Sequence, residues 1–322
     1  MIAWLVVLQT TLTIAVSGPA TNPEYWPLHL AEAEGYFAQE KLAVSLEANR
    51  ADAGAAEALG RGRVDLAATS LDAALELGHT GGRPPKLVFG LTATPAVALL
   101  VPAAQKDSIR GLADLVGKTI GVPAPGTPEQ RVLISLLARA GIKIPQVTIE
   151  SYGERGLVGA LESGRVAAVV LGDPYATRLV EAGKASLLID LRKRGEIARL
   201  LGEPVVHAAI FVRADTALGP AELKSLVRAL LRAMARVEEA SPEEIQARLP
   251  APAIGFPEDF RARLLGAREI FLRDGRVTAQ MLSASVALVR SRSPIPAKVK
   301  LPRSMDNLLL TGPLEEVLGT RR

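Results

Sequence analysis

The residues best suited to bind a small molecule lie in four short segments, each between an apolar run and an amphipathic stretch. Backbone N–H groups at a helix start attract anions, and Ser, Thr and Asp side chains either cap such starts or bind polar groups. Rigid aromatic rings can stack on a flat ligand. We therefore expect a binding site made of Asn22, Tyr25, Trp26, Thr69, Ser70, Gly126, Thr127, Asp173 and Tyr175.

Segment 122–129 is the strongest candidate of the four. Gly126 would allow a ligand to approach the backbone, and Thr127 can cap a helix that starts at Pro128. The free N–H groups of such a helix start favour a polar or negatively charged ligand group. Every segment also has a structural alternative: the polar residues can simply cap helices, and the aromatic residues, Trp26 above all, can pack within their own domain.

Residues for covalent or metal chemistry are scarce. The chain has no cysteine, which excludes disulfides, Cys-based zinc sites and thiol nucleophiles. None of the three histidines, His29, His79 and His207, pairs with another at metal-ligand spacing, so we expect them in surface or packing positions. The sequence contains neither a G-x-S-x-G motif nor a Walker A motif. We predict a protein that is not an enzyme, with no catalytic residue, metal or cofactor.

The composition is that of a globular protein. The chain has 322 residues, of which 48% are apolar and 22% charged, enough to fill the cores of two domains. The net charge is only +4, and Arg192, Lys193 and Arg194 form the one tight basic run. This charge distribution gives little support to nucleic-acid binding, and we predict no such partner.

Short apolar runs alternate with amphipathic stretches, a pattern typical of βαβ units and a mainly parallel sheet. After about residue 214 the strand pattern stops, and the Pro-rich tail from Arg292 is expected to form an extended strap. Strands are expected at 12–17, 43–48, 64–68, 87–93, 97–101, 119–122, 147–151, 166–170, 185–190 and 206–212. Helices are expected at 27–34, 53–61, 71–79, 128–140, 155–163, 174–182, 221–239, 257–273 and 277–291.

One motif occurs twice, at 58–64 (ALGRGRV) and 160–166 (ALESGRV), with identity at five of seven positions. Each copy follows an amphipathic helix and precedes an apolar strand, and its glycine would let the chain leave the helix in a left-handed conformation. We interpret the repeat as one helix–Gly–strand unit used in two similar domains. In parallel α/β sheets, ligands bind beyond the carboxyl ends of the strands. Two such domains that face each other would therefore form a clamp around one ligand.

Several stretches resemble periplasmic substrate-binding proteins of ABC transporters, in the group that handles nitrate, sulfonates, taurine and thiamine precursors. The resemblance covers roughly residues 12 to 240, and the order and spacing of its pieces carry it. The matching stretches are 30–37 (LAEAEGYF) with 42–44, 56–69, 108–122 with its DL-x-GK pattern, and 173–176 (DPYA).

The resemblance implies an α/β fold of the bilobal type II periplasmic-binding-protein class, two βα lobes joined by two crossing strands. We expect lobe 1 to comprise residues 10–96 and 212–322 and lobe 2 residues 102–206. The hinge strands are expected at 97–101 and 207–211.

The resemblance also implies a function, the solute-binding protein of an ABC importer. Such a protein captures a small polar or anionic organic molecule by closing about its hinge, and its partners are that ligand and the ABC permease subunits in the membrane; we expect a monomer. Gly172 stands where the family usually has Trp, so no particular family ligand is carried over. The alternatives are an enzyme on the same fold, of thiamine-pyrimidine or menaquinone-pathway type, and a ligand sensor. The thiamine-pyrimidine enzyme uses a cysteine-rich motif that this chain lacks.

The first residues are apolar, and no Lys or Arg precedes Lys41. We interpret residues 1–9 as the remnant of a truncated signal sequence, the alternative being a plain N-terminal extension. No later segment has the ~20 apolar residues that a membrane span requires. A periplasmic or otherwise exported protein is therefore expected.

Overall fold

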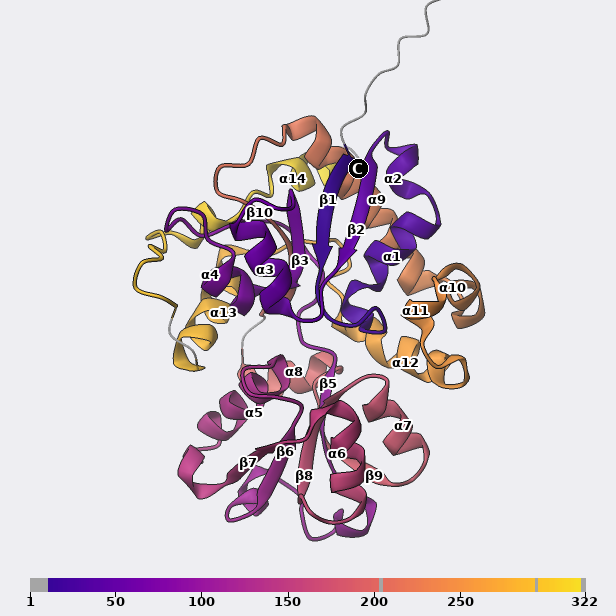
Figure 1. The fold of residues 1–322 in the computed structure, drawn as a ribbon, viewed down its shortest axis with the longest axis vertical. Coiled ribbons are helices and arrows are strands. Elements are labelled where there is room, and N and C mark those ends of the chain that lie inside the picture. Colours follow the sequence, from indigo (N-terminus) through magenta and orange to yellow (C-terminus); the bar gives the residue numbers. More distant parts are fainter. Residues whose placement is uncertain (1–10, 203–204, 293–294, 320–322) are drawn as a thin grey trace, which may run out of the picture.

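The computed structural model describes residues 11–202, 205–292 and 295–319, so the interpretation of residues 1–9 lies outside the described residues. Figure 1 shows two α/β lobes, one above the other. The predicted apolar runs form strands in two separate sheets, in which helices cover the strands and favour apolar residues on both faces. The strand order in the sheet of lobe 1 is β2 (Ala43–Ala48), β1 (Thr11–Val16), β3 (Leu66–Ser70), β10 (Ala208–Val212), β4 (Lys86–Gly90). The strand order in the sheet of lobe 2 is β7 (Thr148–Ser151), β6 (Thr119–Val122), β8 (Ala168–Gly172), β5 (Val97–Pro102), β9 (Ala185–Asp190).

The two sheets share one topology, and both are mixed. In lobe 1, β1 pairs in parallel with β2 and β3, whereas β10 is antiparallel to β3 and β4. In lobe 2, β6 pairs in parallel with β7 and β8, whereas β5 is antiparallel to β8 and β9. The expectation of mainly parallel sheets was therefore too simple. Strands β5 and β10 each enter their sheet from the other lobe, so neither is returned in parallel by a crossover helix that packs on its own sheet.

The crossings lie next to the ranges that we expected as hinge strands. Ranges 97–101 and 207–211 belong almost entirely to β5 and β10, which are hydrogen-bonded inside the sheets. Within the described residues, the chain passes between the lobes in 91–96 and, on its return, in 191–202 and 205–207 instead. The expected hinge strands are corrected accordingly, because an apolar strand pattern alone cannot distinguish a strand within a sheet from one between two sheets.

The expected helices before residue 240 are all present, but α2 and α8 were not predicted, and in the C-terminal third tertiary contacts change the pattern. The helices of lobe 1 are α1 (Trp26–Ala33), α2 (Tyr36–Gln39), α3 (Asp52–Gly60), α4 (Leu71–Leu77), α9 (Pro220–Glu239), α10 (Pro242–Arg248), α11 (Ala251–Ile254), α12 (Phe260–Ala267), α13 (Ala279–Arg292) and α14 (Gly312–Gly319). The helices of lobe 2 are α5 (Pro128–Arg139), α6 (Gly153–Glu162), α7 (Tyr175–Glu181) and α8 (Arg194–Leu201). The expected helix at 257–273 is interrupted by two 3-10 turns around α12. The expected extended tail contains α14, whose Leu314 and Val317 are buried in the lobe 1 core.

Helix α9 shows how the apolar spacing produces the lobe 1 core. Leu226, Val227, Leu230 and Met234 recur at three- and four-residue spacing on one face of this helix, and each is at most 3% exposed. Helices α1 and α14 lie against this face. The 3.6-residue period of the apolar side chains therefore determined which side of the helix is buried.

The two copies of the repeated motif occupy equivalent places in the two lobes. Gly62 ends the turn after α3 with φ +69°, and Gly164 ends the turn after α6 with φ +70°. In both turns the next residue donates a backbone hydrogen bond to the helix: Arg63 to the Ala58 carbonyl at 2.9 Å, and Arg165 to the Ala160 carbonyl at 3.0 Å. The left-handed glycine predicted from the repeat is confirmed in both copies.

Gly164→Ala should lower the free energy of unfolding by about 1 kcal/mol, because an L side chain resists a positive φ. No atom lies within 4 Å of the added methyl group, so backbone strain is the main effect. Gly159→Ala within α6 is the matched control, since its methyl group also meets open space; it should raise stability by about 0.5–1 kcal/mol. Urea unfolding monitored by circular dichroism measures both values. Equal effects of the two substitutions would contradict this account.

Candidate functional site

A cleft of ≈ 430 Å³ lies between the lobes. Lobe 1 contributes the loop after β1, the start of α3 and the start of α4; lobe 2 contributes the loop 123–127, the starts of α5 and α6, and the end of β8. Strand ends and helix starts of both lobes therefore meet at one place, as expected for facing α/β sheets. Of the predicted site residues, the cleft is lined by Asn22, Ser70, Gly126, Thr127 and Asp173.

The two aromatic residues predicted to stack on a ligand lie in the lobe 1 core. Trp26 is 0% exposed, packs on Phe260 with ring centroids 5.1 Å apart, and donates its indole N–H to the Ala253 carbonyl at 3.2 Å. Tyr25 is 1% exposed, and its hydroxyl donates to Asp52 at 3.4 Å. This corrects the stacking expectation for both residues, because their rings fill the core and do not line the cleft.

Two other predicted site residues also lie outside the cleft lining. Thr69 is fully buried, and its hydroxyl donates to the Asp52 carbonyl at 3.1 Å, so it fixes the start of α3. Tyr175 is half-buried at the start of α7, where its hydroxyl accepts a hydrogen bond from Arg155 at 3.4 Å. The expected capping role falls to Ser70, which caps α4 by accepting the N–H of Ala73, and Thr69 does not cap that helix.

Segment 122–129, predicted to bind a polar or negatively charged ligand group, lines the cleft. Two of its hydrogen-bond donors are already bonded within the protein. The N–H of Gly126 donates to the side-chain carbonyl of Gln130 at 2.6 Å. The Thr127 hydroxyl donates to the Ala124 carbonyl at 3.0 Å and makes no capping hydrogen bond to α5. Gly126 has a φ of +77°, which is why a glycine is favoured here. These donors would have to change partners before they could bind an anionic group.

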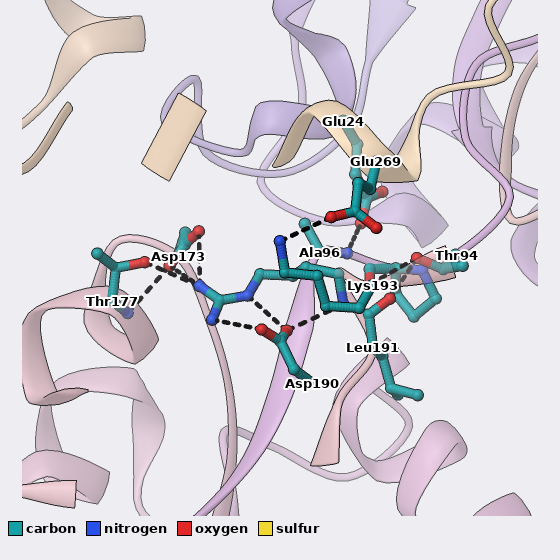
Figure 2. A network of polar contacts seen from close by, with 11 residues as sticks. Glu24, Thr94, Ala96, Asp173, Thr177, Asp190, Leu191, Lys193 and Glu269 are labelled. Carbon is teal, nitrogen blue, oxygen red and sulfur yellow. Dashed lines mark hydrogen bonds and ion pairs between the residues drawn. The ribbon is translucent and has the colours of Figure 1, made fainter. Parts of the chain in front are cut away.

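Asp173 lines the cleft, but the negative charge of its carboxylate is balanced by a buried arginine. Arg192, 5% exposed, donates to both Asp173 oxygens at 3.1 and 3.3 Å, to the Thr177 hydroxyl at 2.8 Å, and to Asp190 at 2.8 Å (Figure 2). Asp173 also accepts from the backbone N–H of Thr177 at 3.1 Å, so it holds α7. Burial alone lowers the pKa of Arg192, but Asp173 and Asp190 raise it overall. The arginine therefore stays charged and joins β9 to the start of α7.

The rest of the basic run is also used within the protein. Lys193 pairs with Glu269 of lobe 1 at 2.8 Å, and Arg194 donates to the Phe271 carbonyl at 2.7 Å (Figure 2 shows the first of these). Both contacts join the second crossing segment to lobe 1. The run is thus a structural junction between the lobes.

Glu24 lies where both crossings meet the cleft. It is 4% exposed; its Oε1 accepts the N–H of Ala96 at 2.7 Å, and its Oε2 lies 3.6 Å from Nε2 of His207. Burial raises the pKa of Glu24, and the charge of His207 opposes this. Glu24 was not predicted from the sequence, and His207 was expected in a surface or packing position, because no local pattern marks two residues that meet only through the fold.

Two arginines of lobe 2 form ion pairs with lobe 1. Arg131 of α5 donates to both carboxylate oxygens of Glu76 at 2.9 Å and lies 3.5 Å from Asp72. Arg178 of α7 lies 3.6 Å from Asp259, with its guanidinium 4.1 Å from the centre of the Phe256 ring. These contacts were not predicted from the sequence, and they hold the two lobes together in the state described here.

The lobe 2 side of the cleft carries two carboxyl groups with perturbed titration. Burial raises the pKa of Glu129 to about 7, although its own backbone N–H and Thr127 oppose this, and the charges of Glu154 and Glu24 raise it further. Burial also raises the pKa of Glu154. The two residues lie in the first turns of α5 and α6, so the fold of lobe 2 brings them to the same side of the cleft. Perturbed carboxyl groups of this kind often mark binding or catalytic sites.

Comparison with known proteins places the chain in a family. The family model described as NMT1/THI5 like matches residues 22–245, more than half of the chain. The chain belongs to the NMT1/THI5-like family. No curated protein matches it.

In the described part of the chain, no group of acidic or histidine residues could hold a metal ion, and no helix is long and apolar enough to span a membrane.

Solved structures at low sequence identity share the fold of this NMT1/THI5-like protein. A protein from Bordetella bronchiseptica RB50 is 23% identical with a TM-score of 0.79, over 97% of this chain and 98% of that one. The alkanesulfonate-binding protein SsuA from Xanthomonas axonopodis pv. citri, bound to MOPS, is 22% identical with a TM-score of 0.69 (94% and 98% covered). The periplasmic nitrate-binding protein NrtA from Synechocystis PCC 6803 is 14% identical with a TM-score of 0.63 (97% and 89% covered).

These likenesses confirm the bilobal periplasmic-binding-protein fold and the family resemblance seen in the sequence. DszB in complex with biphenyl-2-sulfinic acid also has this fold, at 17% identity and a TM-score of 0.62, with 97% of this chain and 100% of that one covered. The fold is therefore shown, while the ligand must be argued from the residues of the cleft.

The stability of the protein should depend on pH through Glu129. Its pKa is higher in the folded protein, about 7, than its ordinary value of 4.5, so this group contributes stability below about pH 4.5 that is lost as the pH rises through 7. Glu129→Gln removes this loss and should raise the free energy of unfolding at pH 8 by about 2 kcal/mol relative to its effect at pH 4.5. Urea unfolding at both pH values tests this; an effect independent of pH would contradict it.

Proposed function

We propose that this protein is the solute-binding component of an ABC importer, located in the periplasm, which captures a small molecule in the cleft between its lobes. The observation that carries the proposal is the ≈ 430 Å³ cleft, into which strand ends and helix starts of two lobes with the same topology open. A ligand that contacts both lobes at once stabilises the closed state. The SsuA and NrtA likenesses support this class of function.

The predicted partners follow from this function. Permease subunits of the importer would recognise the closed, ligand-loaded form, and a monomer with one cleft is sufficient for delivery. The cleft residues proposed to contact the ligand are those that line it among the predicted set, namely Asn22, Ser70, Gly126, Thr127 and Asp173.

Transport is distinguished from catalysis by whether the ligand survives. The similarity to DszB keeps an enzyme of the same fold as the alternative, and the perturbed pKa of Glu129 gives that alternative a candidate proton-transfer group. If a compound that stabilises the protein is recovered unchanged after long incubation with it, binding is supported. Recovery of a product that does not form without the protein would show an enzyme.

Closure about the crossings is tested through the ion pair of Arg131 with Glu76. Arg131→Ala removes this half-buried, bidentate contact, worth about 1 kcal/mol, and should shift the ligand-free protein toward an open state with a larger radius of gyration. Saturating ligand should return the radius to the wild-type value. Arg61→Ala is the control, because Arg61 pairs with Glu57 on one exposed helix face within lobe 1.

Small-angle X-ray scattering measures these radii. If the wild type and Arg131→Ala have the same radius without ligand, and ligand changes neither, the clamp mechanism is wrong.

A further inference from the structure

The charge of the cleft opposes the expectation of an anionic ligand. Four lining carboxyl groups have no arginine or lysine ion pair in the described structure: Glu24, Asp52, Glu129 and Glu154. They come from both lobes, Glu24 and Asp52 from lobe 1 and Glu129 and Glu154 from lobe 2. A ligand held between the lobes would therefore meet carboxyl groups on both sides.

The basic groups of the cleft offset this charge only in part. The charge of Arg131 is balanced by its interlobe ion pairs with Glu76 and Asp72. His207 faces Glu24 at 3.6 Å. Arg50, the other arginine of the lining, is exposed beside the start of α3. The interior of the cleft thus has an excess of carboxyl groups.

The backbone donors that could receive an anion are used as well. Gly126 donates to Gln130, and the Thr127 hydroxyl donates to the Ala124 carbonyl. The first turn of α5 also carries the carboxyl group of Glu129. An anion at this helix start would therefore lie beside the carboxyl groups of Glu129 and Glu154, which line the same cleft.

A positively charged ligand has the opposite effect on these groups. Burial makes the ionised forms of Glu129 and Glu154 costly, and the charges of Glu154 and Glu24 add to this cost for Glu129. A cation placed between them and Glu24 would remove that repulsion and would form charge-assisted hydrogen bonds, which are about twice as strong as neutral ones. The closing lobes would exclude water and strengthen these contacts.

We propose that the ligand of this cleft is a small organic cation, whose positively charged nitrogen lies between Glu24 of lobe 1 and Glu129 and Glu154 of lobe 2. This inference rests on the proposed function and specifies its ligand class. It replaces the small polar or anionic ligand expected from the sequence, because the charged side chains that line the cleft are predominantly acidic.

The test sorts ligands by charge without assuming their identity. The small-molecule fraction of yeast extract is separated by cation- and anion-exchange resins into cationic, anionic and unretained pools, and each pool is added to ligand-stripped protein in a thermal-unfolding assay. Benzamidine, benzamide and benzoate, which share one planar ring and differ in charge, are measured alongside. We expect the cationic pool to raise the melting temperature most, and benzamidine to exceed benzoate.

Stabilisation by the anionic pool alone would overturn this inference and leave the proposed function standing. Stabilisation by the unretained pool alone would do the same. If no pool stabilises the protein, the proposed function fails, and the inference fails with it. The two failures are therefore distinguishable in one experiment.

Variants then locate the cation. Glu154→Gln should weaken binding of the stabilising cation at least about tenfold, equivalent to 1.4 kcal/mol, when measured by titration calorimetry. Glu162→Gln is the matched control: it makes the same charge change at the opposite end of α6, where Glu162 pairs with Lys184 on the surface, and it should leave affinity unchanged. Equal affinities of wild type and Glu154→Gln, in a protein that unfolds at the wild-type temperature, would overturn the placement.

Discussion

The carboxyl group of Glu24 is where lobe 1 contacts both segments that cross to lobe 2. One oxygen accepts the N–H of Ala96 in the first crossing, and the other faces His207 at the end of the second. Burying a carboxyl group is costly unless it is hydrogen-bonded and faces a partner that can carry charge. The contact therefore couples the geometry of the crossings to that of the cleft.

The shared topology of the lobes explains why the cleft is acidic. Both sheets direct strand ends and helix starts to the same gap, and Glu24, Asp52, Glu129 and Glu154 near these ends line it. Glu129 and Glu154 each follow a helix start in lobe 2, an ordinary position for an acidic residue near a helix dipole. Together with Glu24 they give the cleft an acidic character that no single helix explains.

The role of the basic run at 192–194 depends on where the fold places its three side chains. In the sequence it is a cluster of three cations with no evident partner. In the fold Arg192 binds Asp173 and Asp190 inside lobe 2, and Lys193 and Arg194 bind lobe 1. The run fastens the second crossing to both lobes, so the orientation of the lobes depends on it.

The strands, most of the helices and the duplicated helix–Gly–strand unit could be predicted from the sequence, because apolar period, helix caps and glycine turns are local properties. Together with the family motifs they were enough to predict the fold class and the loops around the cleft. The burial of Trp26, the reversed strands β5 and β10, and the partners of Arg131 and Arg192 could not be predicted. Each depends on contacts between residues far apart in the chain, and so does the charge of the cleft, which only the tertiary structure decided by bringing Glu24, Glu129 and Glu154 together.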